Sequence, residues 1–205
     1  MRAFIYVGGE IYPENITEHP KGDDICIAAD SGYVNAVRLG ESVNIFVGDR
    51  DSYHGELPPS VETVELKPEK DLTDTQVAVE LALSRGSDDI VIIGGLSGRL
   101  DHTLSNLAIL EDLKARGAHG VIADGYNRVR FIRNDSALIA RSNYRYLSLL
   151  AADEKVKGVE IKGVKYPLNN AKISRSLQFA VSNEIDGNCA FIAVKKGGVF
   201  IIESK

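Results

Sequence analysis

The sequence has few cysteines, no tryptophan and no long apolar run. Its two cysteines, Cys26 and Cys189, lie in separate apolar segments without CxxC spacing. This pattern argues against a cysteine metal site and predicts two small buried hydrophobes in strands. No segment approaches the ~20 apolar residues of a membrane span, and the apolar run within Met1–Gly9 is too short for a signal peptide. We therefore expect a soluble cytoplasmic protein that does not bind membranes.

The sequence also lacks an excess of positive charge. Its 24 Lys and Arg residues face 29 Asp and Glu residues, which gives a net charge of −5. An acidic chain has no general attraction for nucleic acid or anionic lipid, so we expect no nucleic-acid partner. If such a chain binds a polyphosphate, it needs a metal ion or a local basic cluster to offset the repulsion. The hydrophobic fraction of 44% is ample for a folded core.

Strand and helix patterns alternate through the first two thirds of the 205 residues. Short apolar runs, most of them followed by Gly or Asp, predict strands at 3–7, 25–29, 44–47, 90–93 and 121–123. Helices are predicted at 34–39, from the capping box of Thr73 and Gln76 to Gly86, and at 100–116. The last helix should bury an apolar face of Leu100, Leu104, Leu107, Ala108 and Leu110. The polar stretch 52–68 is expected to be partly loop, and the whole pattern favours a parallel sheet covered on both faces.

The pattern changes after Asp124. Short apolar runs separated by turn residues predict strands at 129–132, 137–140, 146–150, 156–161, 191–194 and 199–202. Such spacing without a convincing helix predicts a small all-β sandwich or barrel. We therefore expect an α/β domain at residues 1–130 and a β-rich domain at residues 131–205, packed together.

Acidic residues follow the second and third predicted strands. Asp30 ends the second strand, and Asp49 and Asp51 follow the third. Because the carboxyl ends of parallel strands line one crevice, these carboxylates should meet at one edge of the sheet. Magnesium suits such an all-oxygen site and is usually shared with substrate phosphates. A single Asp after a strand is also a common turn or cap residue, and Asp74 also suits a helix N-terminus through the helix dipole.

The segment Gly94-Gly95-Leu96-Ser97-Gly98-Arg99 joins a predicted strand to a predicted helix. Backbone N–H groups at such a junction can cradle phosphate, and Arg99 can offer it a bidentate fork. The segment matches neither a Walker A loop nor GxGxxG. His102 follows, where a structural role is commoner than that of a base. We find no nucleophile with a paired base, so covalent catalysis has no support.

Several segments become recognisable together. They are Asp30-Ser31-Gly32 with Asn35-Ala36, Gly48-Asp49-Arg50-Asp51-Ser52, Lys70-Asp71-Leu72-Thr73-Asp74-Thr75, Gly94 to Asn106, Lys165-Tyr166-Pro167-Leu168 and Val181-Ser182-Asn183-Glu184. In this order and spacing they resemble the motifs of the thiamine pyrophosphokinase family, over nearly the whole chain.

The resemblance implies a Rossmann-like nucleotide-binding domain followed by a β-rich thiamine-binding domain. It also implies a homodimer with active sites between subunits. The reaction implied is that of ATP with thiamine, in the presence of Mg²⁺, to give AMP and thiamine diphosphate. The mechanism expected is in-line attack by the thiamine hydroxyl on the β-phosphorus, helped by positioning and charge stabilisation.

The resemblance also implies roles for single residues. It makes Asp49, Asp51 and Asp74 the metal ligands, with Asp30 and Asp71 close by. The nucleotide would contact Asp30, Lys70, Thr73, Gly94, Gly95, Gly98 and Arg99. Arg99 and Asp101 would line the junction of nucleotide and thiamine, and Ser182 and Asn183 would hold thiamine. Asp71 and Asp101 are both candidates for a general base.

Two features depart from the family pattern. Arg50 stands where the family commonly has an aromatic residue, and the chain has no tryptophan to stack on thiamine.

Two other functions stay open: a different Mg²⁺-dependent phosphotransferase acting on a small alcohol, and a non-catalytic thiamine or nucleotide sensor. The set of acidic residues argues against the sensor.

Overall fold

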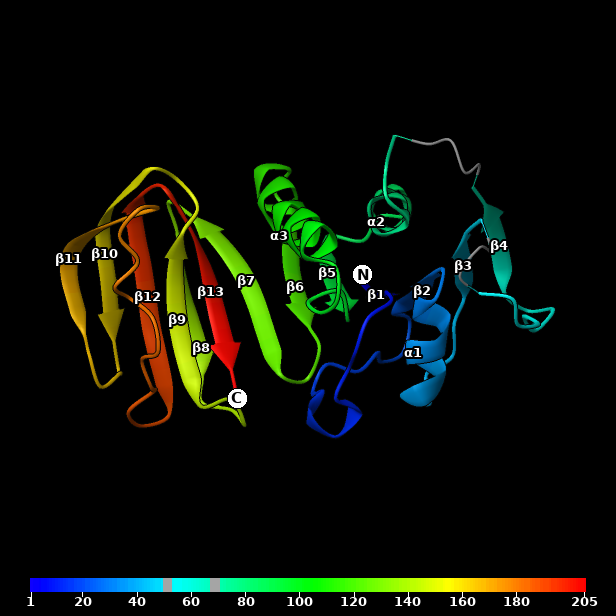
Figure 1. Ribbon diagram of the computed structural model, residues 1–205, viewed down its shortest axis with the longest axis horizontal. Helices are drawn as coiled ribbons and strands as arrows, with labels where there is room; N and C mark the ends of the chain where they lie inside the picture. The colour runs from blue at the N-terminus through cyan, green and yellow to red at the C-terminus, as the bar shows by residue number, and fades with distance from the viewer. Residues whose placement is uncertain (50–52, 67–70) are drawn as a thin grey trace. The chain divides into compact units, whose positions relative to one another are not determined.

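The computed structural model of the chain describes residues 1–49, 53–66 and 71–205 (Figure 1). It divides into two compact units, Met1–Gly125 and Tyr126–Lys205. The boundary expected after residue 130 falls inside β7 (Asn127–Arg133), which belongs to the second unit.

The first unit is built on a parallel sheet. Its strands are β1 (Arg2–Tyr6), β2 (Ile25–Ala29), β3 (Ile45–Gly48), β4 (Glu62–Glu65), β5 (Asp89–Ile93) and β6 (His119–Ala123). They pair in the order β4-β3-β2-β1-β5-β6, and every pair is parallel. The predicted parallel sheet is therefore confirmed. Since β2 and β5 flank β1, the strand order reverses there, and crevices for ligands form at such a reversal.

Helices cover both faces of this sheet. They are α1 (Gly32–Arg38), α2 (Asp74–Ser84) and α3 (Leu100–Ala115), and a single 3₁₀ turn, η1, spans Pro13–Asn15. Ala36 of α1 packs in one cluster with Phe4 of β1. Leu110 and Leu113 of α3 approach Gly120 of β6 so closely that a Cβ there would lie 2.7 and 2.8 Å from them. Because Gly120 and Phe4 face opposite sides in the strand register, α1 and α3 cover opposite faces.

The predicted capping box at the start of α2 is confirmed. Thr73 Oγ1 accepts a hydrogen bond from the Gln76 backbone N–H at 3.2 Å, and Gln76 Oε1 accepts one from the Thr73 N–H at 3.0 Å. These two bonds satisfy backbone donors that the first helical turn leaves unpaired. They fix the position of Thr73 and Asp74 at the carboxyl edge of the sheet.

The predicted apolar face of α3 is wrong at its N-terminal half. Leu100 and Leu104 are 69% and 57% exposed, and Ala108 is exposed as well. The residues that α3 buries are Asn106, Ile109, Leu110 and Leu113. The helix is therefore rotated relative to the prediction, and it turns a polar residue towards the sheet.

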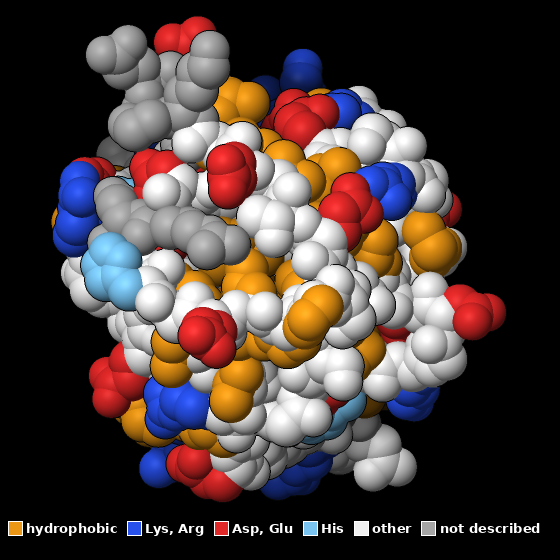
Figure 2. Space-filling view, turned by 90° about the vertical axis from the view of Figure 1, so that its right-hand side faces the viewer, with side chains coloured by type: hydrophobic (Ala, Val, Ile, Leu, Met, Phe, Trp, Pro, Cys, Tyr) orange, Lys and Arg blue, Asp and Glu red, His pale blue; other side chains and the backbone are white. Residues whose placement is uncertain are grey.

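The predicted loop at 52–68 contains a strand that the sequence did not reveal. Strand β4 pairs with β3 at the edge of the sheet, and three of its four residues are exposed. Figure 2 looks onto this side of the first unit and shows acidic side chains scattered among apolar and uncharged ones, with Lys and Arg nearer the margins. Charged residues on an edge strand discourage pairing with another chain.

The second unit is all β. Strands β7, β8 (Ser136–Ala140), β9 (Tyr146–Ala151), β10 (Lys155–Lys162), β11 (Leu168–Ser174), β12 (Cys189–Lys196) and β13 (Gly198–Ser204) form two antiparallel groups. The groups have the orders β7-β13-β9 and β11-β10-β12-β8. Both contribute to one core that includes Leu149, Val159, Ile192 and Ile201. The predicted all-β unit is confirmed, with β11 as a strand that the sequence pattern missed.

The two cysteines differ in their surroundings. Cys26 is buried in β2, whereas Cys189 is exposed at the start of β12. The expectation of a buried thiol is therefore wrong for Cys189, because the first residue of a strand need not face the core. Among the described helices, none has the length and apolar character needed to cross a membrane.

Candidate active site

A pocket of about 470 Å³ opens at the carboxyl edge of the parallel sheet. It is lined by Val7, Gly8, Gly9, Ala29, Asp30, Ser31, Thr73, Asp74, Thr75, Gly95, Ser97, Gly98, Arg99, His102 and Asn106. These residues come from the carboxyl ends of β1, β2 and β5 and the loops that follow them, and from the N-terminal turns of α2 and α3. The pocket therefore lies at the reversal of strand order, where the topology predicts a ligand.

The floor of the pocket is mostly backbone. The loops after β1 and β5 are joined by a hydrogen bond from the Gly95 N–H to the Gly8 carbonyl at 3.1 Å. The Glu10 N–H donates to Ser97 Oγ at 2.7 Å. Gly9 has a φ of +101°, and a Cβ there would lie 2.9 Å from Ser97 Oγ. Only glycine fits such a contact without strain, so a ligand can approach the main chain directly.

Two buried asparagines brace these loops. The Asn35 amide of α1 donates to the carbonyls of Val7 and Gly9 at 2.8 and 3.0 Å. The Asn106 amide of α3 donates to the Gly95 carbonyl at 3.0 Å. Both side chains are about 95% buried, so these bonds satisfy groups that water does not reach. Neither residue was predicted to belong to the site, although each is a polar residue among apolar helix positions, which is a readable signal.

Asp30 lies at the centre of the predicted acidic edge. It is 7% exposed and has a φ of +48°, a left-handed conformation that non-glycine residues seldom adopt. Its N–H donates to the Val47 carbonyl at 2.8 Å, which ties it to the end of β3. A Cβ on Gly48 would lie 3.3 Å from the Asp30 Cα. Asp49 follows this glycine, so the two carboxylates belong to neighbouring strand ends, as predicted.

Arg99 and Asp101 form an ion pair at the rim. Arg99 donates from Nε and one terminal nitrogen to the two oxygens of Asp101, at 3.2 and 2.7 Å. Their side chains are 73% and 65% exposed. The hydrogen bond from Arg99 holds the pKa of Asp101 below its usual value, and the same bond raises the pKa of Arg99. The guanidinium fork is thus already directed at an anion beside the pocket.

The pocket brings together part of the predicted site. Six of the predicted site residues line it: Asp30, Thr73, Asp74, Gly95, Gly98 and Arg99. Its lining omits Asp49, Asp71, Gly94 and Asp101. Gly94 lies behind the lining, with a φ of +96° and no room for a Cβ beside the Val7 carbonyl. Asp51 and Lys70, like Arg50, lie outside the described residues.

The described carboxylates can be tested for their fit to a metal ion. Within residues 1–49, 53–66 and 71–205, no group of three or more His, Cys, Asp or Glu side chains is arranged to hold one. Asp30 and Asp74 nevertheless line one pocket, and Asp49 follows the strand beside Asp30. Carboxylate oxygens alone form a donor set that suits Mg²⁺ completed by phosphate oxygens and water. The donor chemistry therefore fits the expected ion.

The predicted thiamine residues lie in the second unit. Ser182 is exposed with a φ of +56°, and its N–H donates to Ser148 Oγ at 3.0 Å. Asn183 is 5% exposed, and its Oδ1 accepts from the N–H groups of Tyr166 and Glu184, each at 3.0 Å. Its amide nitrogen donates to the Tyr166 carbonyl at 2.8 Å. Asn183 therefore holds the loops around Ser182 and Tyr166 in place.

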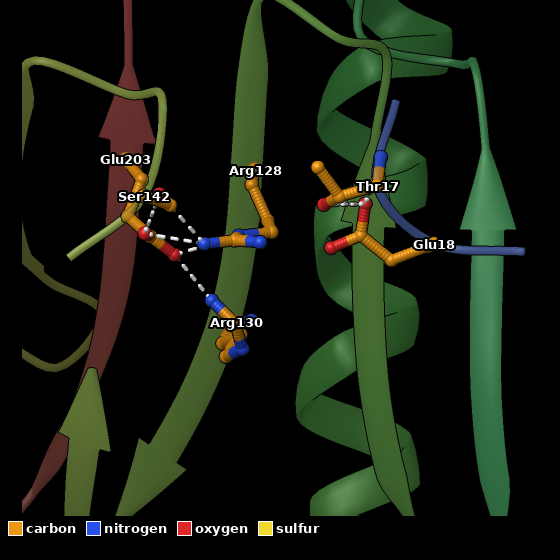
Figure 3. A network of polar contacts seen from close by, with 6 residues as sticks. All are labelled: Thr17, Glu18, Arg128, Arg130, Ser142 and Glu203. Carbon is orange, nitrogen blue, oxygen red and sulfur yellow. Dashed lines mark hydrogen bonds and ion pairs between the residues drawn. The ribbon is translucent and has the colours of Figure 1, made fainter. Parts of the chain in front are cut away.

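The second unit also holds a buried charged cluster (Figure 3). Arg128 donates to both oxygens of Glu203, at 2.8 and 2.6 Å, and Arg130 is paired with the same carboxylate. Ser142 Oγ lies 3.3 Å from Glu203. The side chains of Arg128 and Glu203 are only 10% and 2% exposed. The cluster joins β7 to β13 and has the character of a structural pair.

Comparisons with known proteins agree over both units. The family model described as "Thiamin pyrophosphokinase, catalytic domain" matches residues 18–122, and that described as "Thiamin pyrophosphokinase, vitamin B1 binding domain" matches residues 136–199. The chain is 27% identical over 196 residues to thiamine pyrophosphokinase of Bacillus subtilis, covering 93% of this chain and 92% of the relative. It is 26% identical over 188 residues to thiamin pyrophosphokinase 1 of Caenorhabditis elegans, covering 85% and 77%. The crystal structure of the Bacillus subtilis enzyme superposes with a TM-score of 0.90 at 25% identity, covering 100% of this chain and 99% of that one.

Proposed function

From the premise that the chain belongs to the thiamin pyrophosphokinase family, we propose that it transfers the pyrophosphoryl group of ATP to thiamine. The products are thiamine diphosphate and AMP. The observation that carries this proposal is the backbone-lined pocket at the strand reversal. Most of its lining falls within the catalytic-domain match at residues 18–122, and it has an arginine fork at its rim.

The nucleotide binds in this pocket through its phosphates. The N–H groups of Gly94 and Gly95 already donate to the carbonyls of Ala123 and Gly8, so these glycines contribute close approach of the main chain. Exposed Gly98 and the first turn of α3 favour anions, and Arg99 offers a bidentate contact. Thr73 lines the same pocket from the start of α2. Asp30 and Lys70 complete the proposed nucleotide contacts. Binding of a polyphosphate to a chain of net charge −5 then depends on a local cation.

That cation is Mg²⁺, held by Asp49, Asp51 and Asp74, with Asp30 and Asp71 close by. When bound, the ion offsets the charge of the triphosphate and supplies electrostatic stabilisation in the transfer. The proposal is supported by the oxygen-only donor chemistry of the described carboxylates at this edge.

The chain's own residues position the reactants. The thiamine hydroxyl attacks the β-phosphorus in line, and AMP leaves with the electrons of the broken P–O bond. Arg99 leaves its exposed contact with Asp101 and donates to the phosphoryl oxygens, where charge develops. Asp101 and Asp71 are the candidates to accept the hydroxyl proton. The hydrogen bond from Arg99 lowers the pKa of Asp101 and makes this carboxylate a weaker base, so release of Arg99 to the phosphate makes Asp101 a better proton acceptor.

Thiamine binds to the second unit, with Ser182 at its surface and Asn183 fixing the loop that carries it. The B1-binding model over residues 136–199 supports this division of labour. We also propose a homodimer with active sites between subunits. Support comes from large apolar side chains of this unit that are 43–68% exposed: Tyr166, Leu177, Phe179 and Val181. A cytoplasmic location stays a prediction.

The decisive experiment follows AMP release from ATP and Mg²⁺, with and without thiamine. Thiamine-dependent AMP that disappears with EDTA is expected. ADP as the product would instead identify an ordinary kinase, and AMP release with a different alcohol would identify another phosphotransferase. Bound thiamine with no nucleotide product would identify a sensor.

The metal assignment has its own test. Asp49→Asn and Asp74→Asn should each abolish most turnover, whereas Asp88→Asn, at the amino-terminal edge of the sheet before β5, should not. Near-normal turnover in the first two variants would show that these carboxylates do not hold the ion.

A further inference from the structure

Three aromatic rings gather at the edge of the first unit. Tyr33 of α1 and Tyr53 have ring centroids 5.0 Å apart, and Phe46 of β3 lies 5.8 Å from Tyr53 and 6.4 Å from Tyr33. Phe46 is fully buried, whereas both tyrosines are half-buried. We call Tyr33, Phe46 and Tyr53 the aromatic shelf. Both tyrosines are partly exposed beside the buried Phe46 ring, and the Tyr53 hydroxyl donates to the Glu56 carbonyl at 3.3 Å.

The shelf adjoins the pocket through Asp30. The Tyr33 N–H donates to the Asp30 carbonyl at 3.1 Å, which places Tyr33 one turn after a pocket residue. Gly48 has no side chain at the point where the shelf and Asp30 meet. A Cβ there would lie 3.3 Å both from the Phe46 ring and from the Asp30 Cβ. The shelf and the pocket therefore share one wall.

The two neighbouring regions differ in chemistry. The pocket is lined by glycine backbone, hydroxyls and charges, and no described residue of its lining carries a phenyl or phenol ring. Such a lining suits phosphates but gives a flat, apolar base little to contact. Bases gain stability chiefly by stacking on aromatic side chains. The thiamine rings are accounted for elsewhere, because the B1-binding model matches only residues 136–199 of the second unit.

We propose that Tyr33 and Tyr53 are the surface on which the base of the nucleoside triphosphate stacks, while its phosphates occupy the neighbouring pocket. Phe46 is a positioning residue that supports both rings from beneath. The inference rests on the proposed function for the identity of the nucleotide as ATP. Because stacking does not read the edge of a base, the shelf favours large flat bases without selecting adenine by hydrogen bonds.

Binding measured without thiamine tests the shelf independently of turnover. Calorimetric titration of Tyr33→Leu and Tyr53→Leu with ATP and Mg²⁺ should each give a Kd about 10-fold above that of the unaltered chain. Tripolyphosphate, which has no base, should bind all three proteins equally. Tyr33→Phe keeps the ring and should restore ATP affinity. Phe200→Leu removes a ring from the Phe131–Phe200 pair of the second unit, whose centroids lie 5.1 Å apart, and should leave ATP affinity unchanged.

Each contrary result overturns the shelf. Unchanged ATP affinity in both leucine variants would make the rings packing residues only. An equal loss for ATP and tripolyphosphate would mean that the substitutions distort the phosphate pocket. A raised KM for thiamine with an unchanged KM for ATP would assign the rings to the other substrate. If the unaltered chain releases no AMP while Tyr33→Leu selectively loses ATP binding, the proposed function fails and the shelf stands.

Discussion

Two arginine–carboxylate pairs of almost equal length lie in the two units. Arg99 and Asp101 approach to 2.7 Å at the rim of the pocket, and Arg128 and Glu203 approach to 2.6 Å between β7 and β13. The first pair is 73% and 65% exposed, and the second is 10% and 2% exposed. The two pairs are alike in N–O distance but differ in burial, and the buried carboxylate of Glu203 also pairs with Arg130, so the comparison shows what burial within a network changes.

Burial decides what each pair can do. Water screens the exposed pair, so it adds little stability and its arginine can exchange Asp101 for a ligand anion. The buried carboxylate of Glu203 has given up its hydration, and removing it leaves the largely buried Arg128 without its partner. The pair at the pocket is therefore suited to function, and the pair in the second unit is suited to holding two strands together.

The largest effect is expected from breaking the buried pair. Glu203→Ala leaves Arg128 and Arg130 without their common partner, and we expect the free energy of unfolding to fall by about 3–5 kcal/mol. Chemical denaturation monitored by circular dichroism measures this loss. The matched control is Asp101→Ala, which breaks the exposed pair. Equal destabilisation by the two variants would refute the contrast.

The exposed pair should behave in the opposite way. Arg99→Ala should lower kcat/KM for ATP by about 10²–10³-fold, as for removal of an arginine or oxyanion donor, while the denaturation midpoint stays unchanged. Arg99→Lys keeps the charge but not the fork, and we expect it to recover only part of the activity. A variant that loses stability together with activity would show that Arg99 is structural.

The difference between buried and exposed polar contacts should also hold for an uncharged side chain, the buried Asn35 amide of the first unit. Asn35→Leu leaves the carbonyls of Val7 and Gly9 without their buried donor, and we expect a loss of about 1–3 kcal/mol in unfolding free energy. Because these carbonyls belong to the pocket loop, ATP binding should weaken as well. Asn35→Asp keeps the size of the side chain but has no N–H group to donate to these carbonyls. It should therefore restore neither stability nor ATP binding. Normal stability in Asn35→Leu would show that the loop is held by other contacts.

A smaller effect is expected at the half-buried start of α2. Thr73→Ala removes the hydroxyl that accepts from the Gln76 N–H in the capping box. We expect the free energy of unfolding to fall by about 1 kcal/mol, as is typical for loss of an N-cap side chain. Thr73→Ser retains the hydroxyl and should keep the stability of the unaltered chain. Thermal unfolding of the three proteins measures the difference, and identical midpoints would mean that tertiary contacts alone fix α2.

The smallest effect concerns proton binding at the exposed pair. Arg99 lowers the pKa of Asp101 in the folded chain, so the pair stabilises the fold above the unfolded-state pKa and loses this contribution as pH falls through the folded-state pKa. Carboxyl titration followed by NMR should therefore show the pKa of Asp101 rising in Arg99→Ala. An unchanged pKa in that variant would mean that Arg99 and Asp101 are not paired in solution.

The sequence predicted the interior strands, and both strands that it missed lie at a sheet edge, although the edge strands β8 and β9 were predicted. Buried strands such as β2 and β5 are continuous apolar runs, because parallel strands are covered on both faces. The two missed strands, β4 and β11, are the outermost strands of their sheets. Edge strands are often polar, as in Glu62–Glu65, so their pairing depends on a neighbour that the local pattern does not contain.

Helix α3 shows a second limit of pattern reading. Leu100 and Leu104 have the spacing of a core face, yet they lie at the exposed end of the helix beside the pocket. Asn106 is polar and is buried because the Gly95 carbonyl needs a donor. The spacing of apolar residues can be read from the local sequence. Which side chain will meet an unpaired backbone carbonyl can be known only once the fold brings the two together.

The candidate site was predicted in outline through strand ends and helix starts. Asp30, Asp74 and Arg99 share a pocket, as the rule for carboxyl ends of parallel strands requires. Its glycine-lined floor and its two asparagine braces were not predicted, because they depend on contacts between loops that are far apart in the chain. The tyrosines of the aromatic shelf likewise meet only after β3 and α1 are placed together.

The absence of a side chain at Gly32 has a mechanical consequence. A Cβ there would lie 2.0 Å from the Tyr6 carbonyl oxygen, so the start of α1 rests directly on β1. Asn35 also donates to the carbonyls of Val7 and Gly9 in the loop after β1. This wall of the pocket is therefore rigid, because α1 cannot shift relative to β1 without breaking these hydrogen bonds and the close packing at Gly32.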